Sequence, residues 1–243
     1  MKKILIGLAI GVGISTAIAM AQNRFYPPTP DFDQAVQASL DKVLKDKIFD
    51  LTWKKTFHWL TLFESLDGYT KSAGVTPSTD EYIDFLTDGT NGNNQNLSKQ
   101  PLYQGLITFA NKSYFRSNIY FVNNTNQTIY LVVGLKTGSA YGFKAVNGTL
   151  FGVTRNGGSE STVSLGSISI GEDYNLEARY SPSDKVVFLV DSVEKGTLSA
   201  NLPVPTSTPH QNLFYADITA DAATIKEMQI SFFEYMQFRD VLQ

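Results

Sequence analysis

The stretch Ala223-Thr-Ile-Lys-Glu-Met-Gln-Ile-Ser-Phe-Phe-Glu-Tyr-Met-Gln237 alternates apolar and polar residues close to the C-terminus. Short segments of the same kind precede it from about Thr56 onward, and Gly, Asn, Ser or Pro turns separate them. Alternation with a period of two sends successive side chains to opposite faces of a strand, so each strand buries one face. Repeated this often, the pattern predicts an all-β fold in which antiparallel sheets pack as a sandwich or barrel.

The same alternation predicts where the individual strands begin and end. Strands are predicted at residues 56–64, 102–109, 113–122, 128–135, 140–146, 149–155, 161–170, 173–180, 185–191, 214–219 and 225–237. The pair Asn147-Gly148 predicts a two-residue hairpin turn, and Pro182-Ser-Asp184 predicts a turn between two later strands. The segment 88–98 is rich in Gly, Asn and Gln, which predicts a long polar loop.

Composition excludes several classes of function. The 243 residues carry a formal net charge of −3, whereas a nucleic-acid interface needs a basic face. The chain contains no cysteine, which excludes disulfides, thiolate metal ligands and a cysteine nucleophile. The folded domain must therefore depend on its packed core rather than on covalent cross-links.

The N-terminus predicts export. A lysine pair precedes an apolar or small-residue segment at 4–20, and Ala19-Met20-Ala21 fits the pattern of a signal-peptidase site. Residues 1–21 are interpreted as a signal peptide, with Gln22 as the first mature residue. The alternative is a retained membrane anchor, because Gly7-Leu-Ala-Ile-Gly11 has the small-residue spacing that lets membrane helices pack closely. In both cases the domain faces outward.

Residues 22–52 predict a proline-rich spacer and a short amphipathic helix. Three prolines keep the segment 22–30 extended. An aspartate cap then predicts a helix to about Ile48, with one apolar stripe. The stripe consists of Val36, Leu40, Val43 and Leu44. We interpret it as a stalk or a helix packed on the domain, or alternatively as an assembly helix, and we assign the sandwich domain to 53–243.

Four segments, in their order, carry a family resemblance. They are Phe63-Glu-Ser-Leu-Asp-Gly-Tyr69, Ser113-Tyr-Phe-Arg-Ser-Asn-Ile-Tyr-Phe121, Tyr174-Asn-Leu-Glu-Ala-Arg-Tyr-Ser-Pro-Ser-Asp-Lys-Val-Val-Phe-Leu-Val-Asp191 and the closing strand. Together, over roughly residues 55–238, they resemble the concanavalin A-like lectin/glucanase superfamily, including its laminin-G-like modules. The resemblance implies a jelly roll of two antiparallel sheets. It also implies carbohydrate binding, glycoside hydrolysis or a purely structural role.

The sequence does not predict an enzyme. Glycosidases of this superfamily carry Glu-x-Asp-x-Glu or Glu-x-Asp-x-x-Glu on one strand, so that both carboxylates reach one sugar. The nearest match here is Glu172-Asp-Tyr-Asn-Leu-Glu177, in which the Asp follows the Glu directly and points to the opposite face. The two histidines, His58 and His210, lie near no Gly-x-Ser-x-Gly motif.

A carbohydrate-binding face is predicted from alternation in two strands. It consists of Arg116, Asn118 and Tyr120 on one strand and Glu177 and Arg179 on the other. Sugar sites combine such polar groups with aromatic surfaces. The alternative interpretation is the ordinary solvated side of a sheet with cross-strand salt bridges.

No cofactor is expected, and calcium is the one metal with candidate oxygen ligands. Those ligands are Asp80, Glu81, Asp84 and Asp88, and solvated turns are the alternative interpretation. Five sequons for N-glycosylation stand at Asn96, Asn111, Asn123, Asn126 and Asn147.

These observations order three hypotheses about function. The first is a non-enzymatic exported or membrane-anchored structural protein of a virion or cell-surface layer, with other subunits as partners and the membrane as a partner of residues 4–20. The second is a lectin-like adhesion module that binds glycans. The third is a glucanase-type glycoside hydrolase. Nucleic acid is not an expected partner.

Overall fold

A computed structural model describes residues 56–61, 66, 68–78, 82–100, 108–204 and 213–238, and for 56–61 it describes the backbone alone. The chain divides into two units, of which the second spans Lys55–Gln243. The predicted leader, spacer and amphipathic helix all lie outside the described residues, as do Asp80, Glu81 and His210. Within the described part of the chain, no helix is long and apolar enough to cross a membrane.

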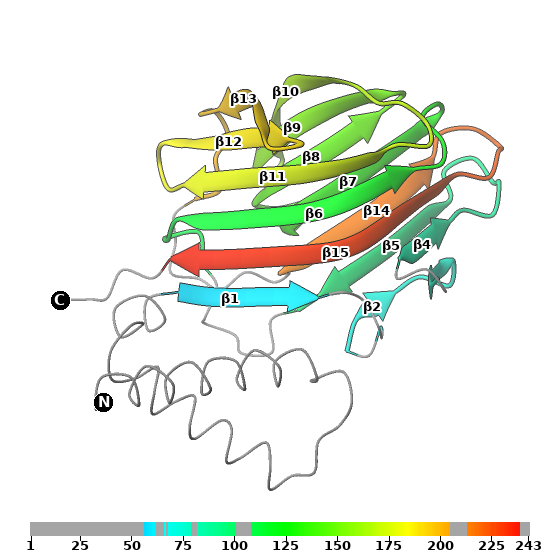
Figure 1. The fold of residues 1–243 in the computed structure, drawn as a ribbon, viewed down its shortest axis with the longest axis horizontal. Coiled ribbons are helices and arrows are strands. Elements are labelled where there is room, and N and C mark those ends of the chain that lie inside the picture. Colours follow the sequence, from blue (N-terminus) through cyan, green and yellow to red (C-terminus); the bar gives the residue numbers. More distant parts are fainter. Residues whose placement is uncertain are drawn as a thin grey trace, which may run out of the picture. The chain divides into compact units, whose positions relative to one another are not determined.

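The described residues form fifteen strands in two antiparallel sheets (Figure 1). Sheet A has the order β13-β12-β11-β6-β15-β4-β3, and β1 also pairs with β15. Its strands are β1 (Thr56–Thr61), β3 (Val75–Pro77), β4 (Ile83–Leu86), β6 (Ser113–Phe121), β11 (Asp173–Ser181), β12 (Lys185–Val190), β13 (Val193–Leu198) and β15 (Glu227–Phe238). The quoted C-terminal stretch, as β15, thus lies inside sheet A between β6 and β4.

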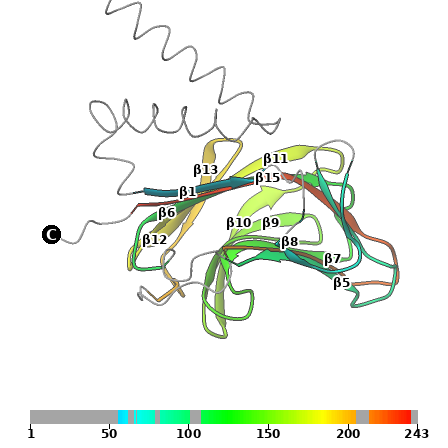
Figure 2. The same ribbon diagram turned by 90° about the horizontal axis from the view of Figure 1, so that it is seen from below.

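Sheet B has the order β10-β9-β8-β7-β14-β5-β2 and packs behind sheet A, as the edge-on view of Figure 2 shows. Its strands are β2 (Thr70–Lys71), β5 (Asn94–Lys99), β7 (Gln127–Gly134), β8 (Ala140–Val146), β9 (Thr149–Asn156), β10 (Ser159–Ser167) and β14 (Phe214–Ala220). Strands β7 to β10 follow one another as a meander. The two-sheet sandwich expected from the alternation is confirmed.

Aromatic side chains from both sheets fill the space between them. The rings of Phe115 and Phe233, from neighbouring strands of sheet A, stack with centroids 5.2 Å apart. Phe214 of sheet B meets Phe233 edge-on at 4.5 Å. Glycine makes room where rings are large: a Cβ at Gly152 would lie 2.4 Å from the Phe188 ring. The core is therefore built by interlocking aromatic rings, and these contribute beyond their buried area.

Buried tyrosines carry the polar groups of this core. The hydroxyl of Tyr180 donates to the carbonyl oxygens of Phe109 at 2.9 Å and Pro203 at 3.1 Å. The hydroxyl of Tyr141 lies 2.7 Å from that of Ser113, and the rings of Tyr141 and Tyr180 stack. Burial raises the pKa of Tyr180 to about 12 and raises that of Tyr141 well above its ordinary value.

Both predicted turns are present. Asn147 and Gly148 both have positive φ, of 47° and 80°, as a primed two-residue hairpin turn requires. Ser183 lies in the turn between β11 and β12, also with positive φ.

The predicted loop at 88–98 is wrong in its second half, because β5 begins at Asn94 and pairs with β14. Sequence patterning missed this strand because Gln95 points inward, where its Oε1 accepts from the Gly74 amide at 2.9 Å. The short strands β2 to β4 and the exposed edge strand β13 were not predicted either. Residues 101–107 of the predicted strand 102–109 lie outside the described part.

Candidate functional site

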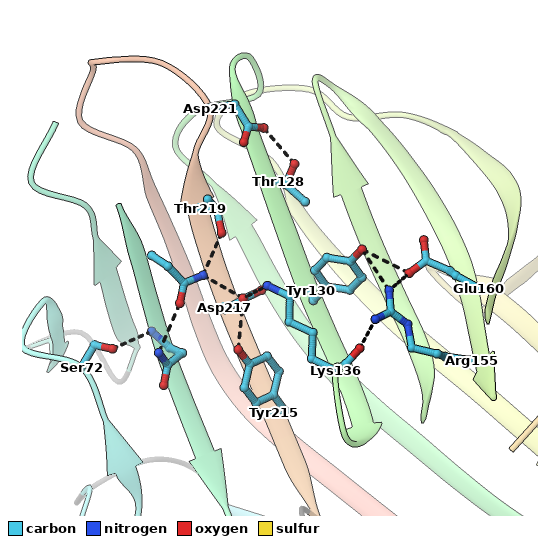
Figure 3. Close-up of polar contacts among 12 residues, drawn as sticks. Ser72, Thr128, Tyr130, Lys136, Arg155, Glu160, Tyr215, Asp217, Thr219 and Asp221 are labelled. Carbon is cyan, nitrogen blue, oxygen red and sulfur yellow. Dashed lines mark hydrogen bonds and ion pairs between the residues drawn. The ribbon is translucent and has the colours of Figure 1, made fainter. Parts of the chain in front are cut away.

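The outer face of sheet B carries a dense cluster of polar side chains (Figure 3). On β14 the core takes Phe214, Ala216 and Ile218, so alternation turns Tyr215, Asp217 and Thr219 outward. We use the name Asp217 cluster for the residues that meet here from six strands and the β7–β8 turn. They are Asn94, Tyr130, Lys136, Lys144, Arg155, Glu160, Tyr215 and Asp217.

Asp217 is the most deeply placed member, with a side chain 0% exposed. Its Oδ2 atom accepts from the Asn94 amide at 2.8 Å and the Tyr215 hydroxyl at 3.1 Å, and it forms an ion pair with Lys136. Its Oδ1 atom is buried and has no hydrogen-bond partner among the described residues. Burial, and then the nearby Asp217 charge and hydrogen bond, raise the pKa of Tyr215, so this hydroxyl stays a donor.

Tyr130 lies at the centre of the cluster with three cations around its ring. The ammonium nitrogens of Lys136 and Lys144 lie 4.8 and 5.0 Å from the ring centroid, and the Arg155 guanidinium carbon lies 5.6 Å away. Such contacts are favourable because the ring face is electron-rich. The ring therefore holds the three cations over one patch of the sheet.

Glu160, on β10, lies at the end of the cluster away from Asp217. It accepts from Lys144 at 2.8 Å and from the Tyr130 hydroxyl at 3.1 Å, and it pairs with Arg155. Burial alone would raise the pKa of Glu160, but the hydrogen bonds and charges of Lys144 and Arg155 lower it below its ordinary value. Glu160 is thus held ionised. Arg155 also donates to the carbonyl of Lys136, which fastens the β7–β8 turn over the sheet.

A small apolar surface adjoins these charges on the same face. Val132, Ala140 and Val153 pack with Tyr130, and the half-buried ring of Tyr215 borders them. Val132, Ala140 and Val153 are buried, so the partly exposed Tyr215 ring is the apolar group that this cluster presents beside the amide and hydroxyl donors and the buried acceptor. This combination suits a ligand that has both C–H surface and hydroxyl groups.

The five predicted sugar-binding residues lie together on the outer face of sheet A. Strands β6 and β11 are direct neighbours, and their register places Arg116 opposite Glu177 and Asn118 opposite Asn175. The predicted alternation is confirmed in both strands. Arg116, Asn118, Tyr120, Glu177 and Arg179 thus share one face, which we call the Arg116 face.

The contacts of the Arg116 face are those of a solvated sheet surface. Arg179 donates to Glu177 at 2.5 Å, but its side chain is 60% exposed. Arg116 lies over the Phe232 ring at 5.5 Å, and Asn118 accepts from Ser231 at 3.1 Å. Exposed ion pairs of this kind are weakly held. Their role in binding sugar stays a prediction.

The other candidate residues have local structural roles. Asp84 accepts from Gln229 at 2.8 Å on sheet A, and Asp88 accepts from the Thr90 amide at 2.9 Å in its own turn. Among the described residues, no three His, Cys, Asp or Glu side chains gather as metal ligands. Glu172 is exposed just before β11, and Glu177 belongs to the Arg116 face.

The sequons fall into two places. Asn123, Asn126 and Asn147 lie in turns at the ends of strands, and Asn111 lies two residues before β6. Asn96 instead lies within β5, directly opposite Asp217 in the strand register. A glycan on Asn96 would therefore stand next to the Asp217 cluster.

Sequence reasoning missed the Asp217 cluster. A signal was present in Tyr215-Ala-Asp217-Ile-Thr219, where an aspartate stands at the centre of an alternating strand and shares a face with a tyrosine. Its partners could not be read from the chain. Asn94 lies 123 positions away in the sequence, and Lys136 lies 81 positions away.

No family model matches the sequence, and no curated protein matches it either. Solved structures do match the fold. A protein of unknown function from Shewanella oneidensis aligns with a TM-score of 0.53 and 11% identity, over 90% of this chain and 98% of that one. A glycosidic hydrolase aligns with a TM-score of 0.56 and 11% identity, over 76% and 97%. The Bacillus licheniformis β-glucanase aligns with a TM-score of 0.55 and 10% identity, over 76% and 98%.

These similarities identify the fold as the concanavalin A-like jelly roll, which confirms the resemblance carried by the sequence. Because the sequences are only 10–11% identical, these similarities show the fold and do not show a function.

Proposed function

We propose that this concanavalin A-like jelly roll is a non-enzymatic, outward-facing glycan-binding protein, with the Asp217 cluster as its binding site. One observation carries the proposal: the Asp217 carboxylate is fully buried, yet its Oδ1 atom lacks a partner among the described residues. An unsatisfied buried acceptor costs about 1–3 kcal/mol. A ligand hydroxyl that donates to Oδ1 would remove that cost.

Lys136 is the partly exposed partner of Asp217. Its side chain extends from the β7–β8 turn to Asp217 and is 27% exposed, so it can turn toward water without unfolding the sheet. Asn94 and Tyr215 would then keep Asp217 oriented, since both donate to its other oxygen. A sugar hydroxyl is a suitable guest because it can donate to Oδ1 and accept from Lys136.

The apolar part of the cluster fits the same kind of ligand. A pyranose ring has one face rich in C–H groups, and such faces pack on aromatic and aliphatic side chains. The partly exposed ring of Tyr215 provides that surface next to Asp217, and it packs against the buried Val132 and Val153. The cluster thus combines the two features that carbohydrate sites need.

Two features favour binding over hydrolysis. Glu160 is held ionised by Lys144 and Arg155, whereas a general acid must carry a proton at the working pH. Asp217 and Glu160 also stand on β14 and β10, four strand spacings apart in sheet B, which places their backbones about 19 Å apart. Glycosidase carboxylates lie about 5–10 Å apart.

A glycan array followed by titration calorimetry tests the proposal on the purified chain. We expect at least one glycan to bind, and Asp217→Asn to weaken its affinity at least tenfold. Tyr215→Phe should weaken the affinity less, because it removes one of the donors that orient Asp217. Arg116→Ala, on the other sheet, is the matched control and should leave the affinity unchanged.

Two results would overturn the proposal. One is the absence of binding to any glycan on the array. The other is binding that survives Asp217→Asn and Tyr215→Phe but is lost in Arg116→Ala, which would place the site on the Arg116 face. The melting temperature of each variant is measured beside its affinity, so that loss of fold is recognised.

A structural role in a virion or cell-surface layer is the second candidate. It is supported by the sequence of residues 1–52, which combines an apolar segment, a proline-rich spacer and an amphipathic stripe. Mass spectrometry of the N-terminal peptide from the native source tests it. An intact N-terminus would support a membrane-attached component, and a start at Gln22 would count against attachment through residues 4–20.

A further inference from the structure

Strand β10 differs from β2, β3 and β13, three other strands at the edges of the two sheets. The edges are formed by β13, β3 and β1 in sheet A and by β10 and β2 in sheet B. Strands β2 and β3 have two and three residues, β3 ends in Pro77, and β13 carries Glu194 and Lys195 beside a bulge. Short length, proline, charge and bulges are the usual protection of an edge against another strand.

Strand β10 lacks most of this protection. It is nine residues long, Ser-Glu-Ser-Thr-Val-Ser-Leu-Gly-Ser, without lysine, arginine or proline. Its pairing with β9 is regular from Ser159 to Ser164, before a bulge at Gly166. Within the described part of the chain its other side pairs with no strand. Regular backbone groups along this side can therefore accept a further strand.

We propose that β10 pairs antiparallel with β10 of a second copy of this chain, so that the two B sheets continue across a two-fold axis. Directly opposed residues in an antiparallel pair share one face of the sheet. Glu160, Thr162 and Ser164 lie on the outer face, since they oppose Arg155, Val153 and Phe151 of β9. Neighbouring residues point to opposite faces, so a residue cannot oppose its neighbour in a symmetric pair. One residue must therefore oppose its own copy, with the two-fold axis passing between the two.

The one charged residue of β10, Glu160, excludes one register of this pair. With Thr162 opposite its own copy, Glu160 faces Ser164 of the second copy, which is an acid opposite a hydroxyl. Centring the pair on Glu160 would instead place two carboxylates in contact, which is unfavourable. Centring it on Ser164 would extend the pairing into the bulge at Gly166. The register centred on Thr162 avoids both, and it is the register that we test.

This dimer would face both Asp217 clusters the same way, because antiparallel pairing continues one sheet without turning it over. Two weak sites on one surface bind a multivalent surface more tightly than either does alone. The pairing itself depends only on β10. Failure of glycan binding would therefore leave the test of the dimer unaffected.

The cysteine-free chain allows a cross-linking test without background. Thr162→Cys places its thiol beside its own copy, where directly opposed residues lie about 4.5–5.5 Å apart at the Cα atoms, within disulfide range. Ser164→Cys is the matched control on the same strand and face, with similar exposure. Its two copies would lie four residues apart along the strands, about 14 Å, which is too far.

We expect Thr162→Cys to form a disulfide-linked dimer on a non-reducing gel under mild oxidation, and Ser164→Cys to stay monomeric. Light scattering of the unmodified full chain should show a mass that rises from monomer to dimer with concentration. Thr162→Lys combined with Ser164→Lys should abolish that rise. A chain that stays monomeric overturns the proposal, as does equal cross-linking of the two cysteine variants or a dimer that the lysine pair does not weaken.

Discussion

At the scale of single residues, Asp217 is expected to contribute strongly to stability as well as to binding. Asp217→Ala would leave Lys136, Asn94 and Tyr215 without their shared acceptor. Breaking a buried pair from one side costs about 3–5 kcal/mol, and because Lys136 can reach water we expect about 3 kcal/mol. Urea denaturation measures the loss, and a change below about 1 kcal/mol would contradict this account of the cluster.

Glu177 on the Arg116 face is the control for Asp217, because its partner Arg179 is largely exposed. Glu177→Ala is expected to change the free energy of unfolding by less than about 1 kcal/mol, because exposed ion pairs contribute little. A larger loss of unfolding free energy in Asp217→Ala than in Glu177→Ala would show that the Asp217 cluster is held together more tightly than the Arg116 face.

Tyr180 makes stability depend on alkaline pH. Its pKa rises from 10.0 to about 12 in the folded state, so above pH 10 the unfolded chain loses a proton that the folded chain keeps. Stability therefore falls as the pH rises from about 10 to about 12. Thermal melts from pH 8 to 12 should show this decline, and Tyr180→Phe should make it shallower. A melting temperature that stays constant to pH 12 would contradict the prediction.

Glu160 makes stability depend on acid pH, and here stability falls as the pH is lowered. Its pKa is lowered on folding, so its contribution is present above its ordinary pKa of 4.5 and is lost as the pH falls below that value. Melts between pH 6 and 3 should show that the wild-type chain loses more stability than Glu160→Gln. Equal losses in both proteins would mean that Lys144 and Arg155 do not hold this carboxylate.

At the scale of strands, the close fit of β9 against the opposite sheet limits substitution. Gly152→Ala would place a methyl group 2.4–2.6 Å from three atoms of the Phe188 ring. A rigid ring in a packed core cannot yield easily, so we expect a loss of about 1–3 kcal/mol. Gly158→Ala is the control, since a Cβ there meets nothing within 4 Å. Equal effects of the two variants in chemical denaturation would argue against this packing.

The strands also mark what the sequence can and cannot predict. Strand β6 was recognisable because Phe115, Ile119 and Phe121 alternate with polar residues, and burial follows that alternation. Strand β5 was not, because Gln95 takes an inward position that patterning reserves for apolar side chains. The Asp217 cluster depends on Asn94 of that same strand. A site assembled by sheet pairing between distant segments leaves little trace in any one of them.

At the scale of the whole molecule, the unit Lys55–Gln243 is expected to fold without the residues before it. Both sheets and the aromatic core arise within this unit. A fragment of residues 55–243 should unfold cooperatively, with a melting temperature within a few degrees of the full chain. A fragment without a cooperative transition would show that the preceding residues complete the fold.

The position of β15 has a consequence for biogenesis. This strand, Glu227–Phe238, lies between β6 on one side and β4 and β1 on the other, yet it follows all the other described strands in the chain. Until it emerges, sheet A has a gap between β6 and β4, and β1 lacks the strand with which it pairs. Pairings between such distant segments form slowly. Sheet A must therefore stay incomplete until all the other described strands have left the ribosome, and its unpaired edges need protection from aggregation until then.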